Sequence, residues 1–307
     1  MAKLKDLAKM PEKLAGGHRL CPGCGAPNIF RLAMRAAGPH SVIGIATGCM
    51  EVSTTIYPYS AWKNSFIHSA FENSAATVSG VEAAYKALRR RGKIDKEFKF
   101  MAAGGDGGTY DIGLQSLSGA LERGHNFVYL CYDNEAYQNT GNQRSSSTPM
   151  GSNTTTSPVG NISYGRVGER KDLTAIAAAH HIPYVAQSTG FHWNDLYKKL
   201  EKAFAVEGPA FLNVLSPCVP GWKYPEAKTM HYSQIAVETN FWPLYEIENG
   251  LLTINKVPKE RLPIEEWLKG QGRFRHLFIP KNRHVIDKLQ AEVDKRWNEL
   301  LERAGKK

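Results

Sequence analysis

Asp106 stands between two pairs of glycines in the run Gly104–Gly108, the stretch of this sequence with the clearest chemical meaning. The run follows residues 98–103, an apolar segment typical of a buried strand, and precedes residues 111–123, whose apolar spacing is helical. Glycines after a strand let backbone N–H groups approach an anion, and the N-terminus of the next helix favours negative charge. Because a carboxylate beside an anion needs a cation between them, we expect an anionic ligand and a divalent metal ion at Gly105, Asp106, Gly107 and Gly108.

A second polar segment, residues 133–136, ends the next predicted strand. Asn134 follows Asp106 by about the length of one helix and one strand, so both emerge where open α/β sheets bind ligands. A carboxylate oxygen, an amide oxygen, a backbone carbonyl and two phosphate oxygens form the shell that Mg²⁺ prefers. A Rossmann dinucleotide site is the competing interpretation, but position 110 is tyrosine where Gly-x-Gly-x-x-Gly requires glycine.

Four of the five cysteines have positions that suit metal binding: Cys21, Cys24, Cys49 and Cys218. The first two form a CxxC motif, and the other two each follow a predicted strand, so all four can meet the glycine-rich loop at one sheet edge. Four cysteines bind either zinc or a [4Fe–4S] cluster. The single CxxC motif with two distant partners favours the cluster and leaves zinc open. Cys131, inside a predicted strand, is expected in the core.

The apolar pattern predicts an α/β fold. Buried strands are expected at 42–46, 98–103, 127–132, 184–187 and 210–215. Helices are expected at 69–91, 111–123, 171–181 and 193–204. This alternation predicts a doubly wound, mostly parallel sheet.

The composition of the chain changes in two places. Residues 143–160 are rich in Ser, Thr, Asn, Gly and Pro, and a long loop of this kind inside a compact domain predicts a lid over a site. We expect an α/β domain at 1–217 and a C-terminal extension at 218–307, which packs on the core or on partner subunits. The extension ends in a predicted amphipathic helix, 288–303.

Bulk properties exclude several classes of protein. The net charge of +10 favours an acidic partner or an anionic cofactor, but no nucleic-acid motif accompanies it. No apolar stretch approaches the roughly 18 residues of a membrane span. Residues 1–17 lack the apolar core of a signal peptide, and the cysteine count is odd. We expect a cytoplasmic protein with reduced thiols that binds neither nucleic acid nor membrane.

Several segments together resemble a known family: Cys21–Gly25, Ala46–Val52, Gly104–Gly113 and Tyr132–Gly151. Gly-Asp-Gly followed by Asn is similar to the thiamine-diphosphate signature, although spacing alone predicts only an anion and a divalent metal. The chain resembles the β subunits of pyruvate:ferredoxin oxidoreductases, in the 2-oxoacid:ferredoxin oxidoreductase family. The resemblance implies a thiamine-diphosphate-binding fold that holds thiamine diphosphate, Mg²⁺ and one [4Fe–4S] cluster.

The resemblance also implies roles for individual residues. Cys21, Cys24, Cys49 and Cys218 match the cluster ligands. Asp106, Asn134 and the carbonyl of Ala136 match the Mg²⁺ shell. Asn139 matches a catalytic asparagine that faces the reacting carbon of thiamine. Thr47 and Gly48 match positions that contact the cofactor.

The implied activity is the coenzyme A-dependent oxidative decarboxylation of pyruvate, or its reverse, with electrons passed to ferredoxin. The implied partners are α-, γ- and δ-type subunits, one of which supplies the glutamate that activates thiamine. Three alternatives stay open: another oxoacid, such as a branched-chain 2-oxoacid or oxalate; a non-redox thiamine-dependent decarboxylase with structural zinc; and a non-catalytic binding subunit.

Overall fold

The computed structural model describes residues 4–306, and these build one eight-stranded sheet in the order β2-β1-β3-β4-β6-β5-β7-β8. The first six strands in this order pair in parallel, and β7 and β8 add an antiparallel edge. The parallel strands are β1 (Ser41–Ala46), β2 (Ser65–Ser69), β3 (Lys99–Gly105), β4 (Val128–Asp133), β5 (Tyr184–Thr189) and β6 (Ala210–Leu215). The antiparallel strands are β7 (Leu244–Glu248) and β8 (Leu251–Lys256). The predicted α/β class with a mostly parallel sheet is confirmed.

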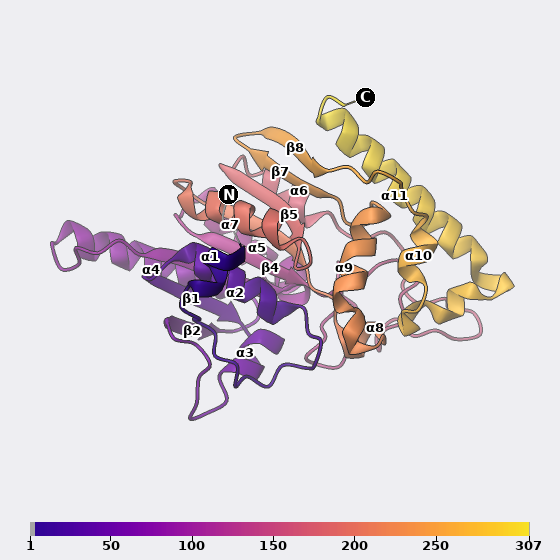
Figure 1. Cartoon of the computed structure of the whole chain (residues 1–307), viewed down its shortest axis with the longest axis horizontal. Helices are drawn as coiled ribbons and strands as arrows, with labels where there is room; N and C mark the ends of the chain where they lie inside the picture. Colours follow the sequence, from indigo (N-terminus) through magenta and orange to yellow (C-terminus); the bar gives the residue numbers. More distant parts are fainter. Residues whose placement is uncertain (1–3, 307) are drawn as a thin grey trace.

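Helices cover both faces of the sheet (Figure 1). One face packs on α2 (Ala26–Ala37) and α7 (Trp193–Ala205). The opposite face packs on α4 (Ser74–Arg90), α5 (Leu114–Glu122), α6 (Leu173–Ala178) and α11 (Arg283–Arg303). Side chains of each strand alternate between the two apolar layers, as the pleat of a strand requires.

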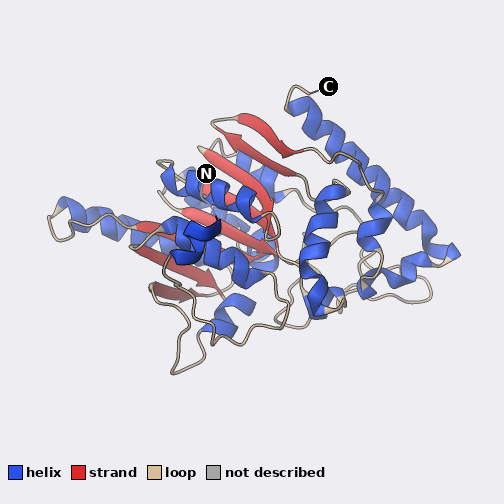
Figure 2. Ribbon diagram, in the orientation of Figure 1, coloured by secondary structure: helices blue, strands red, loops and turns tan. Residues whose placement is uncertain are grey.

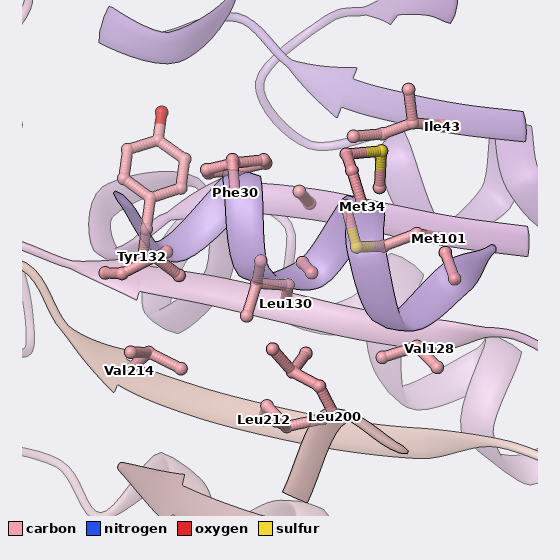
Figure 3. Close-up of a cluster of buried hydrophobic side chains, with 14 of the residues drawn as sticks. Phe30, Met34, Ile43, Met101, Val128, Leu130, Tyr132, Leu200, Leu212 and Val214 are labelled. Carbon is pink, nitrogen blue, oxygen red and sulfur yellow. The ribbon is translucent and has the colours of Figure 1, made fainter. Parts of the chain in front are cut away.

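Helix α2 shows how local sequence produces this packing. Pro27 stands in its first turn, where a missing N–H is harmless, and Gly38 ends it with φ of 76°. Phe30 and Met34 point from α2 toward the sheet residues Met101 and Leu130 (Figure 3). Full burial of side chains of this size stabilises the fold by about 1.5–3 kcal/mol each.

Short elements surround the carboxyl edge of the parallel strands. They are α3 (Cys49–Thr54) after β1, the π-helix η1 (Gly107–Ile112) after β3, and α8 (Val219–Trp222) after β6. Helix α1 (Leu4–Lys9) lies near the N-terminus. In the described part of the chain, no helix has the length and apolarity needed to cross a bilayer.

The helices of the C-terminal segment lie together beside the sheet (Figure 2). A third apolar cluster joins residues of α8, α9 (Thr229–Glu238), α10 (Ile264–Leu268), the 3-10 helix η3 (Gly272–Phe278) and the N-terminal half of α11. Two 3-10 turns, η2 (Glu226–Lys228) and η4 (Pro280–Asn282), belong to the same segment. The same segment also contributes β7 and β8 to the main sheet. The boundary after residue 217 stays a prediction.

Candidate functional site

The glycine-rich loop stands where the sequence placed it, at the carboxyl end of β3. The chain becomes helical at Gly107, whereas the predicted helix began at residue 111. The difference arises from a π-helical turn. Such turns are rare in proteins, and those that exist are often found at functional sites. The loop lines a cavity with residues from β1, β4 and the following loops: Thr47, Gly48, Cys49, Phe71, Gly105, Gly107, Gly108, Tyr132, Asn134, Ala136, Tyr137, Gln138, Asn139 and Thr140.

Two glycines of this cavity are required by close packing. A Cβ atom on Gly107 would lie 2.4 Å from the ring of Tyr137, and one on Gly48 would lie 2.7 Å from the Tyr132 hydroxyl. Neither position tolerates a side chain without displacing a tyrosine. The glycines therefore leave backbone exposed to the cavity, which is what close contact with a diphosphate needs.

Asp106, Asn134 and Ala136 meet at one point, as the sequence predicted for a metal site. Asp106 is fully buried and accepts a hydrogen bond from the Asn134 backbone N–H at 3.2 Å. One end of the Asn134 side-chain amide lies 2.9 Å from Asp106 Oδ1 and 2.8 Å from the Ala136 carbonyl oxygen. With its NH₂ group at this end, the amide donates to both oxygens.

With the amide oxygen at that end, three oxygens converge instead. Adjacent ligands of an octahedral Mg²⁺ ion lie about 2.8–3.0 Å apart when each Mg–O distance is about 2.0–2.1 Å. The separations at Asp106, Asn134 and Ala136 match that geometry. These residues therefore fit a magnesium ion.

The charges around Asp106 also favour a cation at this position. Burial raises the pKa of Asp106 well above its usual value, and the nearby carboxylate of Asp133 raises it further. Ser145 Oγ donates to Asp106 Oδ2 at 2.5 Å and opposes the shift. Two buried carboxylates side by side are costly, and a divalent cation between Asp106 and a diphosphate would offset the cost.

Residues 145–148 donate hydrogen bonds to the carboxylates of Asp106, Asp111 and Asp133. Ser147 Oγ donates to both oxygens of Asp133, at 2.8 and 2.6 Å, and Ser146 N–H donates to Asp111 at 2.9 Å. Ser145, Ser147 and Thr148 are fully buried. These residues are therefore buried and hydrogen-bonded to the acids of the site, and the lid over residues 143–160 stays a prediction. Its Ser and Thr content serves hydrogen bonding to buried acids.

Four thiols surround a second cavity of about 240 Å³, next to the first: Cys21, Cys24, Cys49 and Cys218. Burial raises the pKa of Cys24 to about 11 and the pKa values of Cys49 and Cys218 to about 12, and neighbouring thiols add to each shift. Such thiols ionise when a metal replaces their protons. Cys131 lies apart in the core, as expected, and is fully buried.

Two kinds of metal centre can be held by four cysteines. The sulfurs of a tetrahedral zinc site lie about 3.8 Å apart, since each Zn–S bond is about 2.3 Å. Among residues 4–306, no three His, Cys, Asp or Glu side chains are grouped to hold one metal ion. Four thiols around a larger cavity fit a cluster, in which each cysteine binds a different iron.

The two cavities adjoin. Both are lined by Cys49, Tyr132, Asn134, Gln138 and Asn139. Asn139 is exposed where they meet, and Thr47 Oγ1 lies 2.7 Å from His68 Nε2 at the margin of the first cavity. Every residue expected at the site thus lines one of the two cavities, except Asp106, which is buried and contacts the lining residue Asn134.

Sequence reasoning missed several residues of the site. Tyr132, Phe71, Tyr137 and Gln138 line the cavities, and Ser145 binds Asp106. Tyr132 belongs to a continuous apolar strand, so its local pattern indicated only burial. Ser145 lies in a loop of low sequence complexity, where no spacing rule applies.

The chain is similar to several known proteins. Residues 46–214 match the family "Thiamine pyrophosphate enzyme, C-terminal TPP binding domain". "Pyruvate synthase subunit PorB" of Thermotoga maritima is 53% identical over 97% of this chain and 95% of its own length. "Ketoisovalerate oxidoreductase subunit VorB" of Pyrococcus abyssi is 42% identical over 94% of this chain and 92% of its own length.

The fold is also seen among solved structures, and one example is the 2-oxoglutarate:ferredoxin oxidoreductase from Magnetococcus marinus, with 2-oxoglutarate, coenzyme A and succinyl-CoA bound. The match has a TM-score of 0.57 and 19% identity, covering 89% of this chain and 93% of that chain. At this identity the likeness supports the fold alone.

Proposed function

Because this chain belongs to the family of pyruvate synthase PorB subunits, oxidoreductase subunits with a thiamine-pyrophosphate-binding domain, we propose that it holds thiamine diphosphate, Mg²⁺ and one [4Fe–4S] cluster and acts on pyruvate. One observation carries the proposal. The four-thiol cavity adjoins the Asp106 cavity and shares five lining residues with it. Such proximity suits electron transfer from one site to the other.

Each residue has a role in holding the groups. Asp106, Asn134 and the Ala136 carbonyl hold Mg²⁺, and the backbone of Gly105, Gly107 and Gly108 binds the diphosphate. Thiamine diphosphate supplies the electron sink for loss of CO₂ from a 2-oxoacid. Cys21, Cys24, Cys49 and Cys218 hold the cluster, a one-electron acceptor.

Asn139 is the proposed catalytic residue. It is exposed at the junction of the two cavities, within reach of both. Its amide can donate a hydrogen bond to an oxyanion that develops on the substrate, and it needs no change in protonation to do so. Gly48 and Thr47 face the same space and contact the cofactor.

A partner subunit is part of the proposal. Thiamine needs a glutamate beside its pyrimidine ring, and no glutamate of residues 4–306 lines either cavity. We assign that glutamate to another subunit of the complex, as the resemblance implies. Coenzyme A, α-, γ- and δ-type subunits and ferredoxin complete the reaction.

A branched-chain 2-oxoacid is the second candidate substrate. The ketoisovalerate oxidoreductase subunit is 42% identical to this chain, so fold and site do not by themselves select pyruvate. Structural zinc on the same four thiols is the other candidate for the metal centre, and the iron and sulfide assay distinguishes it from a cluster.

The test is anaerobic purification of the complex, assay of iron, sulfide and thiamine, and activity on a panel of oxoacids. We expect iron and thiamine in the complex and coenzyme A-dependent reduction of ferredoxin with pyruvate. Preference for a branched-chain oxoacid would replace the substrate assignment. Activity without iron bound to this chain would contradict the cluster.

A further inference from the structure

The turn that presents Asn134 and Ala136 depends on Glu135, which lies between them. Glu135 has φ of 66°, in the left-handed region that non-glycine residues avoid at a cost of about 1–2 kcal/mol. Such a conformation persists only where the surroundings over-determine it. The contacts of Glu135 therefore decide where its two neighbours point.

The side chain of Glu135 is fully buried and faces two guanidinium groups. Arg273 Nη2 donates to its Oε2 at 2.6 Å, and Arg170 Nη1 lies 3.8 Å from its Oε1. The backbone is held as well. Glu135 N–H donates to Asp133 Oδ1 at 3.0 Å, and Thr148 Oγ1 donates to the Glu135 carbonyl at 2.6 Å.

Arg273 comes from η3, deep in the C-terminal region, and is itself immobilised. Its guanidinium carbon lies 3.9 Å from the ring centre of Trp222 and 4.7 Å from that of Phe274. Its Nε donates to Gln271 Oε1 at 2.9 Å. Trp222 Nε1 in turn donates to the Asn134 carbonyl at 2.9 Å. The C-terminal region thus holds the turn at both Asn134 and Glu135.

We infer that Arg273 is a positioning residue for the magnesium site: through Glu135 it fixes the turn that brings Asn134 and Ala136 to Asp106. The inference rests on the proposed function, since it concerns the same metal site. Arg273 lines neither cavity, so its effect passes through the turn. Groups that orient metal ligands typically change metal affinity by about 10–100-fold when removed.

A purely structural role is the alternative, and paired variants separate the two. Arg273→Met removes the hydrogen-bonded partner of the buried Glu135 carboxylate and leaves only Arg170 Nη1, 3.8 Å from its Oε1, which is destabilising in its own right. The double variant Arg273→Met with Glu135→Gln removes that charge and leaves the turn without its anchor. Arg275→Met is the matched control. Arg275 is exposed on the same η3 helix, and its substitution removes the same positive charge.

The measurement is the Mg²⁺ concentration needed for half-maximal retention of thiamine diphosphate by the purified complex, followed by equilibrium dialysis. Thermal unfolding of the same preparations without Mg²⁺ and cofactor reports stability. We expect the Mg²⁺ requirement to rise about 10–100-fold in Arg273→Met and to stay raised in the double variant, whose unfolding temperature recovers. Arg273→Lys should restore part of the affinity, and Arg275→Met should match the unmodified protein.

The outcomes distinguish this inference from the proposed function. If the unmodified complex retains thiamine diphosphate and the double variant does so at the same Mg²⁺ concentration, Arg273 has only a structural role. If Arg273→Met does not fold, the double variant decides. An unmodified complex that shows no Mg²⁺-dependent retention would overturn both proposals.

Discussion

At the scale of single residues, the buried acids support the proposed magnesium ion. Asp106 and Asp133 are both fully buried, and burial and the Asp133 carboxylate raise the pKa of Asp106. Serines from residues 145–148 donate to them, but a hydroxyl does not neutralise a charge. The proposed Mg²⁺ would offset the cost of burying the Asp106 carboxylate.

Substituting Asp106 by Asn should separate function from stability. We expect Mg²⁺-dependent retention of thiamine diphosphate to fall by at least about 100-fold, because a charged metal ligand is lost. The free energy of unfolding without cofactor should stay unchanged or rise by about 1 kcal/mol, since the repulsion from Asp133 disappears. Dialysis and denaturant unfolding measure the two effects. Unchanged cofactor retention would show that Asp106 is no ligand.

Gly107 offers a second residue-scale prediction. In Gly107→Ala the new methyl group meets the ring of Tyr137, so we expect a loss of about 1–3 kcal/mol in stability and weaker cofactor binding. Gly80→Ala is the control, because Gly80 is exposed in α4 with open space around it. There we expect a gain of up to about 1 kcal/mol. Equal effects of both substitutions on urea unfolding would refute the packing argument.

At the scale of elements, the strands that were predicted best are those buried on both faces, because such strands are continuous apolar runs. The parallel strands β1, β3, β4 and β6 lie in the sheet interior and are continuous apolar runs, so their positions were predictable to within two residues. Strand β2 was missed because it lies at the sheet edge and is partly exposed, with His68 interrupting its pattern. Strands β7 and β8 were missed because β8 alternates exposed and buried residues within a segment of mixed composition.

The residues of the site likewise differ in how far they could be predicted from the sequence. Cysteines, Asp106 and Asn134 were predictable because strand order in a parallel sheet brings their loops to one edge. The anchor Arg273 was not, because it lies 138 residues after Glu135 and only tertiary packing joins them. Helix α3 was also missed, since it has only six residues, of which Val52 and Thr54 are β-branched, and so carries almost no helical pattern.

His192, the residue that precedes helix α7, should make stability depend on pH. Burial, with the Lys256 ammonium second, lowers the pKa of His192 to about 4. His192 Nε2 lies 2.9 Å from Lys256 Nζ, and Nδ1 lies 2.9 Å from Thr189 Oγ1. Because the folded pKa is below the unfolded value of about 6.5, the neutral ring stabilises the fold above that pH.

This contribution is lost as pH falls from about 6.5 through about 4. We expect His192→Gln, which keeps hydrogen bonding but cannot ionise, to lose less stability over that window. The difference should be on the order of 2 kcal/mol, reduced by the partial exposure of the ring. Urea unfolding at a series of pH values measures it. Parallel pH profiles for the two proteins would exclude His192 as the source.

At the scale of the whole molecule, the C-terminal region is part of the site. It supplies Cys218 to the thiol cavity, Trp222 to the Asn134 carbonyl and Arg273 to Glu135. It also extends the sheet through β7 and β8. The chain therefore builds its two cavities from segments that span most of its length.

The whole chain should still be inactive alone. Because no glutamate of the described residues lines either cavity, we expect the isolated chain to bind thiamine diphosphate and Mg²⁺ but to show no oxoacid-dependent electron transfer. Adding the partner subunits should restore it. Reduction of a dye acceptor with pyruvate and coenzyme A measures both states. Turnover by the isolated chain would place the missing acid in this chain.

The most direct test of the account is the iron and sulfide content of the full chain after anaerobic reconstitution, compared between Cys218→Ala and Cys131→Ala. If the four thiols hold a [4Fe–4S] cluster, we expect about four irons and four sulfides per chain in the unmodified protein and in Cys131→Ala. We expect a marked loss of both in Cys218→Ala. Cys131 is the matched control because it is buried away from the thiol cavity. One zinc and no iron per chain, or equal iron in both variants, would contradict it.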